Sequence, residues 1–453
     1  MNADRTFSHR DPGTDEATWL LDGRWDAVPR LGLAEVLTDF PNVMLVAPHP
    51  DDETLALGAT LADLANAGVA VTVVVVTHGS GTGESAVRRH EATCALAELS
   101  SRIGVLWCEF PDGALGAHED ALIDLLSDVI DSRTLILAPA DDDGHGDHEA
   151  VARAAEAAAR RQQAALLTYP VWLWHWARPD DIDWTRLRVL APTRAGLLAK
   201  TAAIDCYTSQ LTSSDDYPIV GPAVLARARR LFETVIVPRA SDLAARIERY
   251  IAGSPGRAHI AEPFDDMIAG GDNDPWLLDS SFYEQRRLAL VLACLGRERY
   301  RSALEIGCST GQLSNMLADR ADDVTGLDVS AAAIRIARRR FPGVRWSLGA
   351  APGDIPDGRY DLIVLSEIGY FLDGPDLLTT LRTARRLKRC GGEIVLAHWR
   401  LPTSGIPLDG ELVHRQAAAV LDVPLRASYR DADLLIEVWG DPGSVHHPSG
   451  AST

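Results

Sequence analysis

Residues 43–53 read VMLVAPHPDDE, a short apolar run that is followed at once by a polar turn. The Ala- and Leu-rich stretch at 54–66 comes next and predicts a helix. A second apolar run at 69–77 and a helical stretch at 85–99 repeat the same order. Strands that alternate with helices of ten or more residues are typical of βαβ units and a parallel sheet. The sequence therefore predicts an α/β fold for this part of the chain.

A second alternation of strands and helices begins near residue 283, with strands predicted at 302–306, 324–327, 360–365 and 393–397. Between the two alternations, residues 252–275 lose the periodic pattern and gain Gly, Pro and Asp, which favours a linker. We expect two Rossmann-like domains, each a mostly parallel sheet flanked by helices. The predicted parts are a first domain at 1–252, a linker at 253–275, a second domain at 276–440 and a flexible tail at 441–453.

The chain has 453 residues and a formal net charge of −20, with 64 Asp and Glu against 44 Lys and Arg. This charge repels phosphate backbones and anionic headgroups, so we expect neither nucleic acid nor membrane as a partner, but a small neutral or cationic substrate. Six cysteines form no C-x-x-C pair, and the first ten residues lack an apolar signal segment. We therefore expect a cytoplasmic protein. The sequence is compatible with a homo-oligomer.

Candidate metal ligands follow the first and a later strand of the first domain. His49 and Asp52 lie in the turn after the first strand, and His148 lies in HGDH after the strand predicted at 134–138. Loops at the carboxyl ends of parallel strands converge, so these three side chains can meet. Two imidazoles and one carboxylate are the ligand set of a catalytic Zn²⁺ site, and Asp51 beside them is a natural general base. Taken alone, HGDH also fits a structural loop, and the acidic run at 141–143 favours a solvated one.

Together, HPDDE and the later H-x-D-H resemble the PIG-L/LmbE-like family of zinc-dependent N-deacetylases over about residues 40–240. The resemblance implies that His49, Asp52 and His148 bind the metal and that Asp51 is the general base. It also implies that His145 stabilises the oxyanion or protonates the leaving amine, with Asp147 orienting an imidazole. Gly146 stands where the family normally has Pro. Further positions support the resemblance: Gly83, Glu84, Arg88, Arg89, Glu91, 111–113 and 200–211.

Aromatic and acidic side chains near these motifs admit two interpretations each. Trp172, Trp174 and Trp176 follow a predicted strand, where residues two apart share a face that could pack on a sugar ring. An aromatic core explains them equally well. Glu84 and Asp112 either bind substrate hydroxyls or stabilise their loops.

In the second domain, LEIGCSTG at 304–311 links a predicted strand to a helix, and glycines there let the backbone approach a ligand. Asp328 ends the next strand, where a carboxylate can bind ribose hydroxyls. With DGRYDLIVLSE at 357–367, these motifs resemble class I S-adenosylmethionine-dependent methyltransferases over about residues 280–400. DPW at 274–276, SEIGYFL at 366–372 and AHWR at 397–400 look more narrowly like the nodulation-type N-methyltransferase family. A dehydrogenase is disfavoured because the third glycine of its fingerprint has no counterpart near Asn315.

The resemblance assigns cofactor and acceptor roles to side chains at the strand ends of this domain. It implies that the cofactor is contacted by Glu305, Gly307, Gly311, Asp328 and Asp354. Glu367 and His398 are the predicted catalytic residues toward the acceptor, with Tyr370 beside them; His398 and Tyr370 also fit buried structural roles. Ser309 departs from the usual glycine and tolerates a positive φ less well, which puts cofactor affinity in doubt.

These interpretations predict a bifunctional enzyme with Zn²⁺ and S-adenosyl-L-methionine as cofactors. Its first domain would deacetylate a small N-acetylated amino sugar or related metabolite, and its second would methylate the product, on the exposed amine. Two alternatives stay open. The second domain could bind S-adenosylmethionine without catalysis, or it could methylate oxygen or carbon of a different acceptor.

Overall fold

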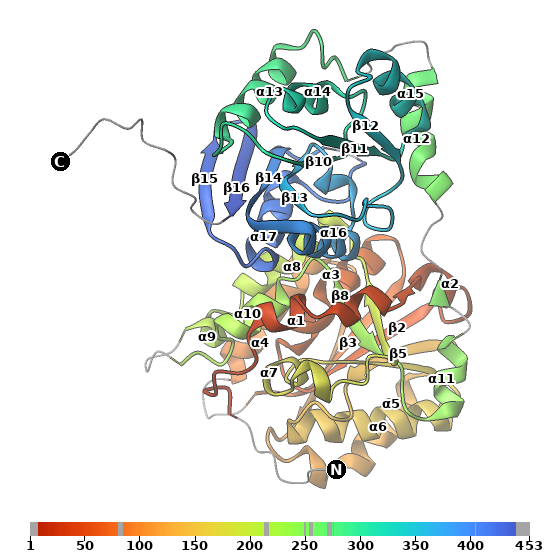
Figure 1. The fold of residues 1–453 in the computed structure, drawn as a ribbon. Coiled ribbons are helices and arrows are strands. Elements are labelled where there is room, and N and C mark those ends of the chain that lie inside the picture. Colours follow the sequence, from red (N-terminus) through yellow and green to blue (C-terminus); the bar gives the residue numbers. More distant parts are fainter. Residues whose placement is uncertain are drawn as a thin grey trace, which may run out of the picture. The chain divides into compact units, whose positions relative to one another are not determined.

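The computed structural model describes residues 8–79, 85–212, 217–248, 251–252, 257–269, 274, 276–403 and 405–440. The chain divides into two compact units, Met1–Gly253 and Ser254–Thr453, and each has its own sheet (Figure 1). Both units are mostly parallel α/β structures, as the alternation of strands and helices predicts. The predicted tail and the Gly83-Glu84 pair lie outside the described residues.

The first unit contains a nine-stranded sheet in the order β4-β3-β2-β5-β6-β8-β7-β1-β9. Its strands are β1 (Arg30–Leu31), β2 (Asn42–Ala47), β3 (Ala70–Thr77), β4 (Gly104–Phe110), β5 (Thr134–Pro139), β6 (Ala165–Tyr169), β7 (Leu187–Leu190), β8 (Glu233–Ile236) and β9 (Ile251–Ala252). Strands β4, β3, β2, β5 and β6 are parallel, whereas β8 is antiparallel to both its neighbours. The apolar sequence AVTVVVVT of β3 suits this position, because strands of a parallel sheet are covered on both faces.

Helices cover both faces of the first sheet. They are α1 (Glu16–Leu20), α2 (Leu33–Asp39), α3 (Asp52–Asn66), α4 (Ser85–Leu99), α5 (Glu119–Val129), α6 (Gly146–Gln162), α7 (Leu173–Trp176), α8 (Arg194–Asp205), α9 (Thr208–Leu211), α10 (Pro222–Ala228) and α11 (Ser241–Glu248), with short 3₁₀ turns at Gly23–Ala27, Leu115–Ala117 and Pro179–Asp181. Side chains of α3, α4 and α8 pack on one face of β2 and β3, and those of α5 and α6 pack on the other. The carboxyl ends of β2 and β5 therefore lie between the two helix layers.

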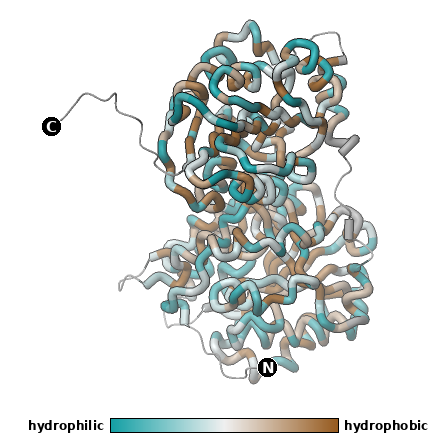
Figure 2. Tube along the Cα trace, in the orientation of Figure 1, coloured by the Kyte–Doolittle hydropathy of each residue, from teal (hydrophilic) through white to brown (hydrophobic). Residues whose placement is uncertain are grey.

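The second unit contains a seven-stranded sheet in the order β12-β11-β10-β13-β14-β16-β15. Its strands are β10 (Ala303–Ile306), β11 (Val324–Asp328), β12 (Arg345–Leu348), β13 (Tyr360–Ser366), β14 (Lys388–Trp399), β15 (Leu425–Arg430) and β16 (Leu434–Gly440). Its helices are α12 (Arg257–Ala269), α13 (Phe282–Cys294), α14 (Gln312–Ala318), α15 (Ala331–Arg340), α16 (Gly374–Leu387) and α17 (Gly410–Val420), with a 3₁₀ turn, η4, at Gly369–Phe371. Strand β16 is antiparallel to both its neighbours, β14 and β15, and the other strand pairs of the described sheet are parallel. Figure 2 shows hydrophobic stretches within both units, and the inner strands β5 and β13 are buried along their whole length.

One segment differs from the sequence prediction. Residues 257–269, within the predicted linker, form helix α12 of the second unit. Asp265 of α12 accepts hydrogen bonds from the hydroxyl of Ser330 (2.6 Å) and the amide of Ala332 (3.0 Å), and so caps α15. The Gly, Pro and Asp residues around this segment conceal the helix because they lower the local helix propensity. Within the described ranges, no helix combines the length and the apolar character that a bilayer crossing needs.

Candidate functional sites

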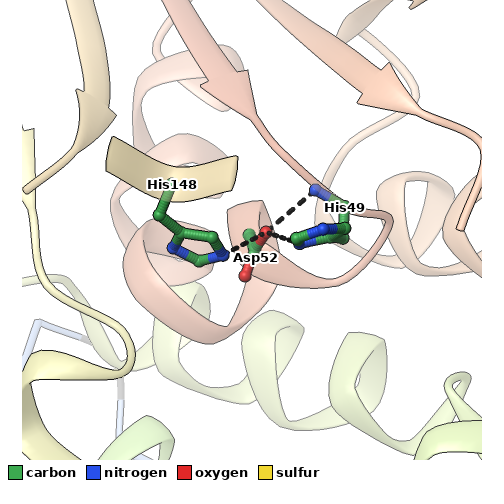
Figure 3. Close-up of side chains that lie close together, drawn as sticks. All are labelled: His49, Asp52 and His148. Atoms are coloured by element: carbon green, nitrogen blue, oxygen red, sulfur yellow. Dashed lines mark hydrogen bonds and ion pairs between the residues drawn. The ribbon is translucent and has the colours of Figure 1, made fainter. Parts of the chain in front are cut away.

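The three predicted metal ligands meet at the carboxyl ends of β2 and β5. His49 follows β2, Asp52 begins α3, and His148 lies in the first turn of α6, and all three are buried. Asp52 Oδ2 lies 3.2 Å from His49 Nδ1 and 3.3 Å from His148 Nε2 (Figure 3). One ligand atom from each residue lies within 4.8 Å of the others. Two imidazole nitrogens and a carboxylate oxygen fit a divalent ion such as Zn²⁺.

Carboxylates also hold the ring nitrogens that face away from Asp52. His49 Nε2 lies 3.3 Å from Asp147 Oδ2 and 3.2 Å from Asp112 Oδ1. His148 Nδ1 lies 2.7 Å from Asp143 Oδ2. Each ring is thus oriented by a carboxylate on one side and leaves its other nitrogen toward the centre, as is usual for metal-binding histidines.

The charges of this cluster shift the pKa values in opposite directions. Burial alone would lower the pKa of His49, but Asp112, Asp147 and Asp52 together raise it well above its usual range. Burial would likewise lower the pKa of His148, and Asp52 and Asp143 raise it to about 9. The pKa of Asp52 lies well below its usual range, because the two imidazoles outweigh its burial. These opposite directions arise because one carboxylate lies between two imidazoles, and a cation at this site would compete with protons for the ring nitrogens.

Asp51, the predicted general base, is buried at the same turn. Its backbone has φ 134°, and its N–H donates to Glu53 Oε2 (3.1 Å). Glu53 is itself held by the hydroxyls of Tyr207 and Thr54. Arg88 donates to Asp51 Oδ2 (3.3 Å). Burial raises the pKa of Asp51 to about 7, which suits a group that accepts a proton near neutral pH.

His145 completes a group of three imidazoles. It precedes α6, and its ring centroid lies 4.9 Å from those of His49 and His148. Its Nδ1 is buried and has no hydrogen-bond partner among the described residues. Burial, together with the charges of His148 and His49, lowers the pKa of His145 to about 4. A neutral ring with one unpaired nitrogen can donate or accept a hydrogen bond to a substrate.

These groups open into a cavity of about 540 Å³. Its lining includes His49, Asp51, Asp52, Arg88, Asp112, His145, Trp172 and Gln210. The tryptophans separate: Trp172 lines the cavity, whereas Trp174 is buried in the core against Trp19. The prediction that they share a strand face is wrong, because residues 173–176 form the helix α7.

The side chain of Asp143 explains why residues 173–176 are helical. Asp143 belongs to the acidic run at 141–143, and the prediction that this run is a solvated loop is wrong for Asp143. Its carboxylate is completely buried and accepts the backbone N–H groups of Val171 (2.9 Å), Trp172 (3.1 Å) and Leu173 (2.9 Å). The same carboxylate contacts His148. Asp143 therefore joins a metal ligand to the cavity wall. Its position two residues before His145, in the turn between β5 and α6, was the signal available in the sequence.

Glu233, which has no signal in the sequence, shapes helix α3. The helix is interrupted at Leu57, which has φ −128° and ψ 20°. Glu233 accepts the N–H groups of Ala59 (3.0 Å) and Thr60 (2.8 Å) beyond this break, and pairs with Lys200 Nζ at 2.6 Å. The buried pair thus caps the second half of α3 and fixes the first half, which carries the metal-site residues.

In the second unit, the strand order reverses beside β10, between β11 and β13. Open α/β sheets bind ligands at such a reversal, outside the carboxyl ends of the strands. Gly307 (φ 78°), Ser309 (φ 49°) and Gly311 (φ 95°) all adopt left-handed backbone in the loop after β10. A Cβ atom at Gly311 would lie 2.5 Å from the Trp346 ring. Ser309 keeps this conformation without being glycine, and its N–H donates to Asp328 Oδ2 (2.8 Å).

The predicted cofactor-binding carboxylates lie around this loop. Asp328 ends β11 and also accepts the N–H of Ser330 (2.9 Å) through Oδ1. Glu305 is buried in β10 and accepts the hydroxyl of Ser314, and burial raises its pKa to about 7. Asp354 follows β12 and accepts the N–H of Ala350 (3.0 Å). The loop and the three carboxylates form one edge of the sheet at β10–β12.

The predicted acceptor-side residues follow β13 and β14. Glu367 has φ 57°; its Oε1 accepts the N–H of Trp399 (2.8 Å), and its Oε2 the hydroxyl of Tyr370. Burial raises the pKa of Glu367. His398 is completely buried, with Nε2 accepting the N–H of Gly369 (3.1 Å) and Nδ1 lying 3.1 Å from His414. This geometry fits the alternative of a buried structural histidine.

Comparison with known families agrees with this division of the chain. The family model PIG-L, described as GlcNAc-PI de-N-acetylase, matches residues 44–159. The family model NodS, described as Nodulation protein S, matches residues 269–400. The chain joins a PIG-L deacetylase domain to a NodS-like methyltransferase domain. These are the two resemblances expected from the sequence motifs, and both are confirmed.

Individual relatives match one domain each. The NodS-like domain is 36% identical over 104 residues to Nodulation protein S of Bradyrhizobium diazoefficiens, covering 22% of this chain and 50% of that protein. The PIG-L domain is 28% identical over 125 residues to the deacetylase YaiS of Escherichia coli, covering 26% of this chain and 68% of that protein. The chain spans about half the length of the nodulation proteins it matches. The structure of N-methyltransferase NodS from Bradyrhizobium japonicum in complex with S-adenosyl-L-homocysteine is 23% identical, with a TM-score of 0.37, and the match covers 41% of this chain and 99% of that one.

The metal-type cluster and the glycine loop therefore lie in regions that match two different families. His49, Asp52 and His148 belong to the PIG-L domain, and the loop around Gly307 belongs to the NodS-like domain. The chain thus combines a domain similar to PIG-L deacetylases with a domain similar to NodS methyltransferases.

Proposed function

We propose that the chain is a bifunctional enzyme that deacetylates a small N-acetylated substrate and then methylates the amine so exposed. The observation that carries this proposal is the pairing of domains. Hydrolysis of an acetamide releases an amine, and an amine is the nucleophile that an N-methyltransferase consumes. The net charge of −20 also favours a cationic amine over an anionic substrate.

We infer an N-acetyl amino sugar or a related metabolite as the substrate of the PIG-L domain. The family description names a GlcNAc derivative. The cavity supports this choice, because Arg88 and Asp112 offer polar contacts and the Trp172 ring offers an apolar face for a sugar.

The residues of the PIG-L domain divide the work of amide hydrolysis. His49, Asp52 and His148 would hold a Zn²⁺ ion, which supplies Lewis-acid polarisation of the carbonyl and lowers the pKa of an attacking water. Asp51 accepts the proton of that water, and its raised pKa matches neutral pH. His145 faces the same space and would donate a hydrogen bond to the oxyanion or pass a proton to the leaving amine. The products are acetate and a free amine.

The residues of the NodS-like domain would align the amine with the cofactor. Gly307 and Gly311 let the backbone approach S-adenosylmethionine, and Asp328 would bind its ribose, with Glu305 and Asp354 nearby. The bound cofactor supplies an activated methyl group. Glu367 lies at the acceptor side, where its carboxylate would orient the amine and accept its proton, because methyl transfer requires an unprotonated nucleophile in line with the methyl group.

Variants that block one domain at a time test the proposal. The full chain would be incubated with zinc, labelled S-adenosylmethionine and a panel of N-acetylated amino sugars or their free amines. We expect Asp51→Asn to abolish methylation of the acetylated substrates but to keep methylation of the amines. Asp328→Ala should release acetate and transfer no methyl group. Methylation of an acetylated substrate by the Asp51→Asn chain overturns the sequential reaction, and fragmentation that places the methyl group on oxygen or carbon overturns N-methylation.

A further inference from the structure

Close contacts connect four groups of the second unit in series, beginning at the backbone amide of Gly369 and ending at the side chain of Glu437. His398 lies near the end of β14, His414 in α17 and Glu437 in β16. Gly369 N–H lies 3.1 Å from His398 Nε2, His398 Nδ1 lies 3.1 Å from His414 Nε2, and His414 Nδ1 lies 2.9 Å from Glu437 Oε2. Both histidines are buried, and Glu437 is 15% exposed in its side chain.

The backbone amide of Gly369 determines where the protons of the two histidine rings lie. An amide N–H can only donate, so His398 Nε2 must accept and carries no proton. A neutral His398 then bears its proton on Nδ1 and donates it to His414 Nε2. His414 consequently bears its proton on Nδ1 and donates to the Glu437 carboxylate. Only one arrangement of protons satisfies all three hydrogen bonds. In it both rings are neutral, and each ring carries its proton on Nδ1.

The amide of Gly369 belongs to the loop that carries Glu367. Gly369 lies two residues after Glu367, whose left-handed backbone (φ 57°) is unfavourable for a glutamate. The loop is closely packed there, since a Cβ atom at Gly369 would lie 2.9 Å from His398 Nε2 and 2.6 Å from Val413 Cγ1. The hydrogen bond from Gly369 therefore ties the strained turn to β14.

We infer that His398, His414 and Glu437 form a positioning relay that fixes the turn at Glu367, and that none of the three contacts the substrate. The inference rests on the proposed role of Glu367 toward the amine. It assigns His398, a predicted catalytic residue, to positioning, and it adds His414 and Glu437, which no sequence motif indicated.

Tautomer measurement tests the relay without using activity. The full chain labelled with ¹⁵N-histidine would be observed by NMR, with His398 and His414 assigned from their Gln variants. We expect both rings neutral at pH 7 with the proton on Nδ1. A proton on Nε2 of His398, or a charged His398 ring, overturns the relay, because neither form can accept the Gly369 amide.

Amine kinetics and cofactor binding test the positioning role. Leu at 398 removes the acceptor, whereas Gln offers an amide oxygen to Gly369. We expect His398→Leu to lower kcat/KM for the amine about tenfold, the loss of about one hydrogen bond, with an unchanged Kd for S-adenosylmethionine. His398→Gln should recover most of the loss and keep the wild-type pH profile. Leu412→Ala, which removes a buried side chain from the same helix, controls for general destabilisation and should leave kcat/KM unchanged.

Two outcomes would contradict a positioning role. One is a His398→Gln chain that binds S-adenosylmethionine but transfers no methyl group and has lost a limb of the pH profile, because His398 would then act as a base. The other is an unaltered kcat/KM in His398→Leu. A wild-type chain that methylates no amine overturns the proposed function instead, and the tautomer spectra then decide the relay on their own.

Discussion

Replacing Asp143 by Asn should weaken metal binding although Asp143 is not a metal ligand. Its Oδ2 lies 2.7 Å from His148 Nδ1 and accepts the N–H of Trp172, and its Oδ1 accepts the N–H groups of Val171 and Leu173. If the asparagine oxygen takes the Oδ1 position, the NH₂ group faces two donors, so both contacts at Oδ2 are lost. His148 then loses the partner that holds its tautomer and orientation. Loss of such a partner weakens metal binding by roughly 10- to 100-fold, or about 1.4–2.7 kcal/mol.

Competition between the protein and a chromophoric chelator for Zn²⁺ would measure this effect. Asp142→Asn is the matched control, because Asp142 belongs to the same acidic run but pairs with Arg239 at the surface. We expect the control to bind zinc as the wild type does. A Kd for zinc in Asp143→Asn within twofold of the wild type would refute the argument that Asp143 orients His148.

Two further predictions concern stability. Burial raises the pKa of Glu305 to about 7 from 4.5, so its contribution is fully present below pH 4.5 and is lost as the pH rises through 7. Relative to the Glu305→Gln variant, the unfolding free energy of the wild type should fall by about 3 kcal/mol over this pH range. Thermal midpoints of both proteins at pH 4.5 and 8 would measure this change. A difference between the two midpoints that is the same at both pH values would contradict the prediction. Lys200→Met should destabilise the PIG-L domain by about 3–5 kcal/mol, because it leaves Glu233 buried without its cation, and Lys200→Met/Glu233→Gln should recover part of this loss in urea unfolding. A double variant no more stable than the single one would speak against a shared role.

The parts of the fold with strong local patterns could be predicted from the sequence. The apolar run of β3 and the helix α4 follow from composition and periodicity within one segment. The metal-type cluster was predictable because parallel strands bring their carboxyl ends to one edge, which joins His49 to His148 across about a hundred residues. The glycine loop at Gly307 and Asp328 was predictable for the same reason.

Features that depend on a remote partner could not be predicted in this way. Asp143 and the helix α7 depend on each other across about thirty residues, so neither alone identifies the turn. Glu233 caps the break in α3 from a strand more than 170 residues away. His398 has the position of a catalytic residue in the sequence, and only the contact with His414 of α17 shows that both its nitrogens are occupied.

We propose that one chain turns an acetamide into a methylated amine through the free amine. The most direct test is a time course by mass spectrometry, with the full chain, zinc, S-adenosylmethionine and N-acetylated amino sugars. We expect the free amine to appear first and the N-methylated amine to follow, with no methylated product that keeps its acetyl group. A methylated product that still carries the acetyl group, or a free amine that accumulates without methylation, would contradict it.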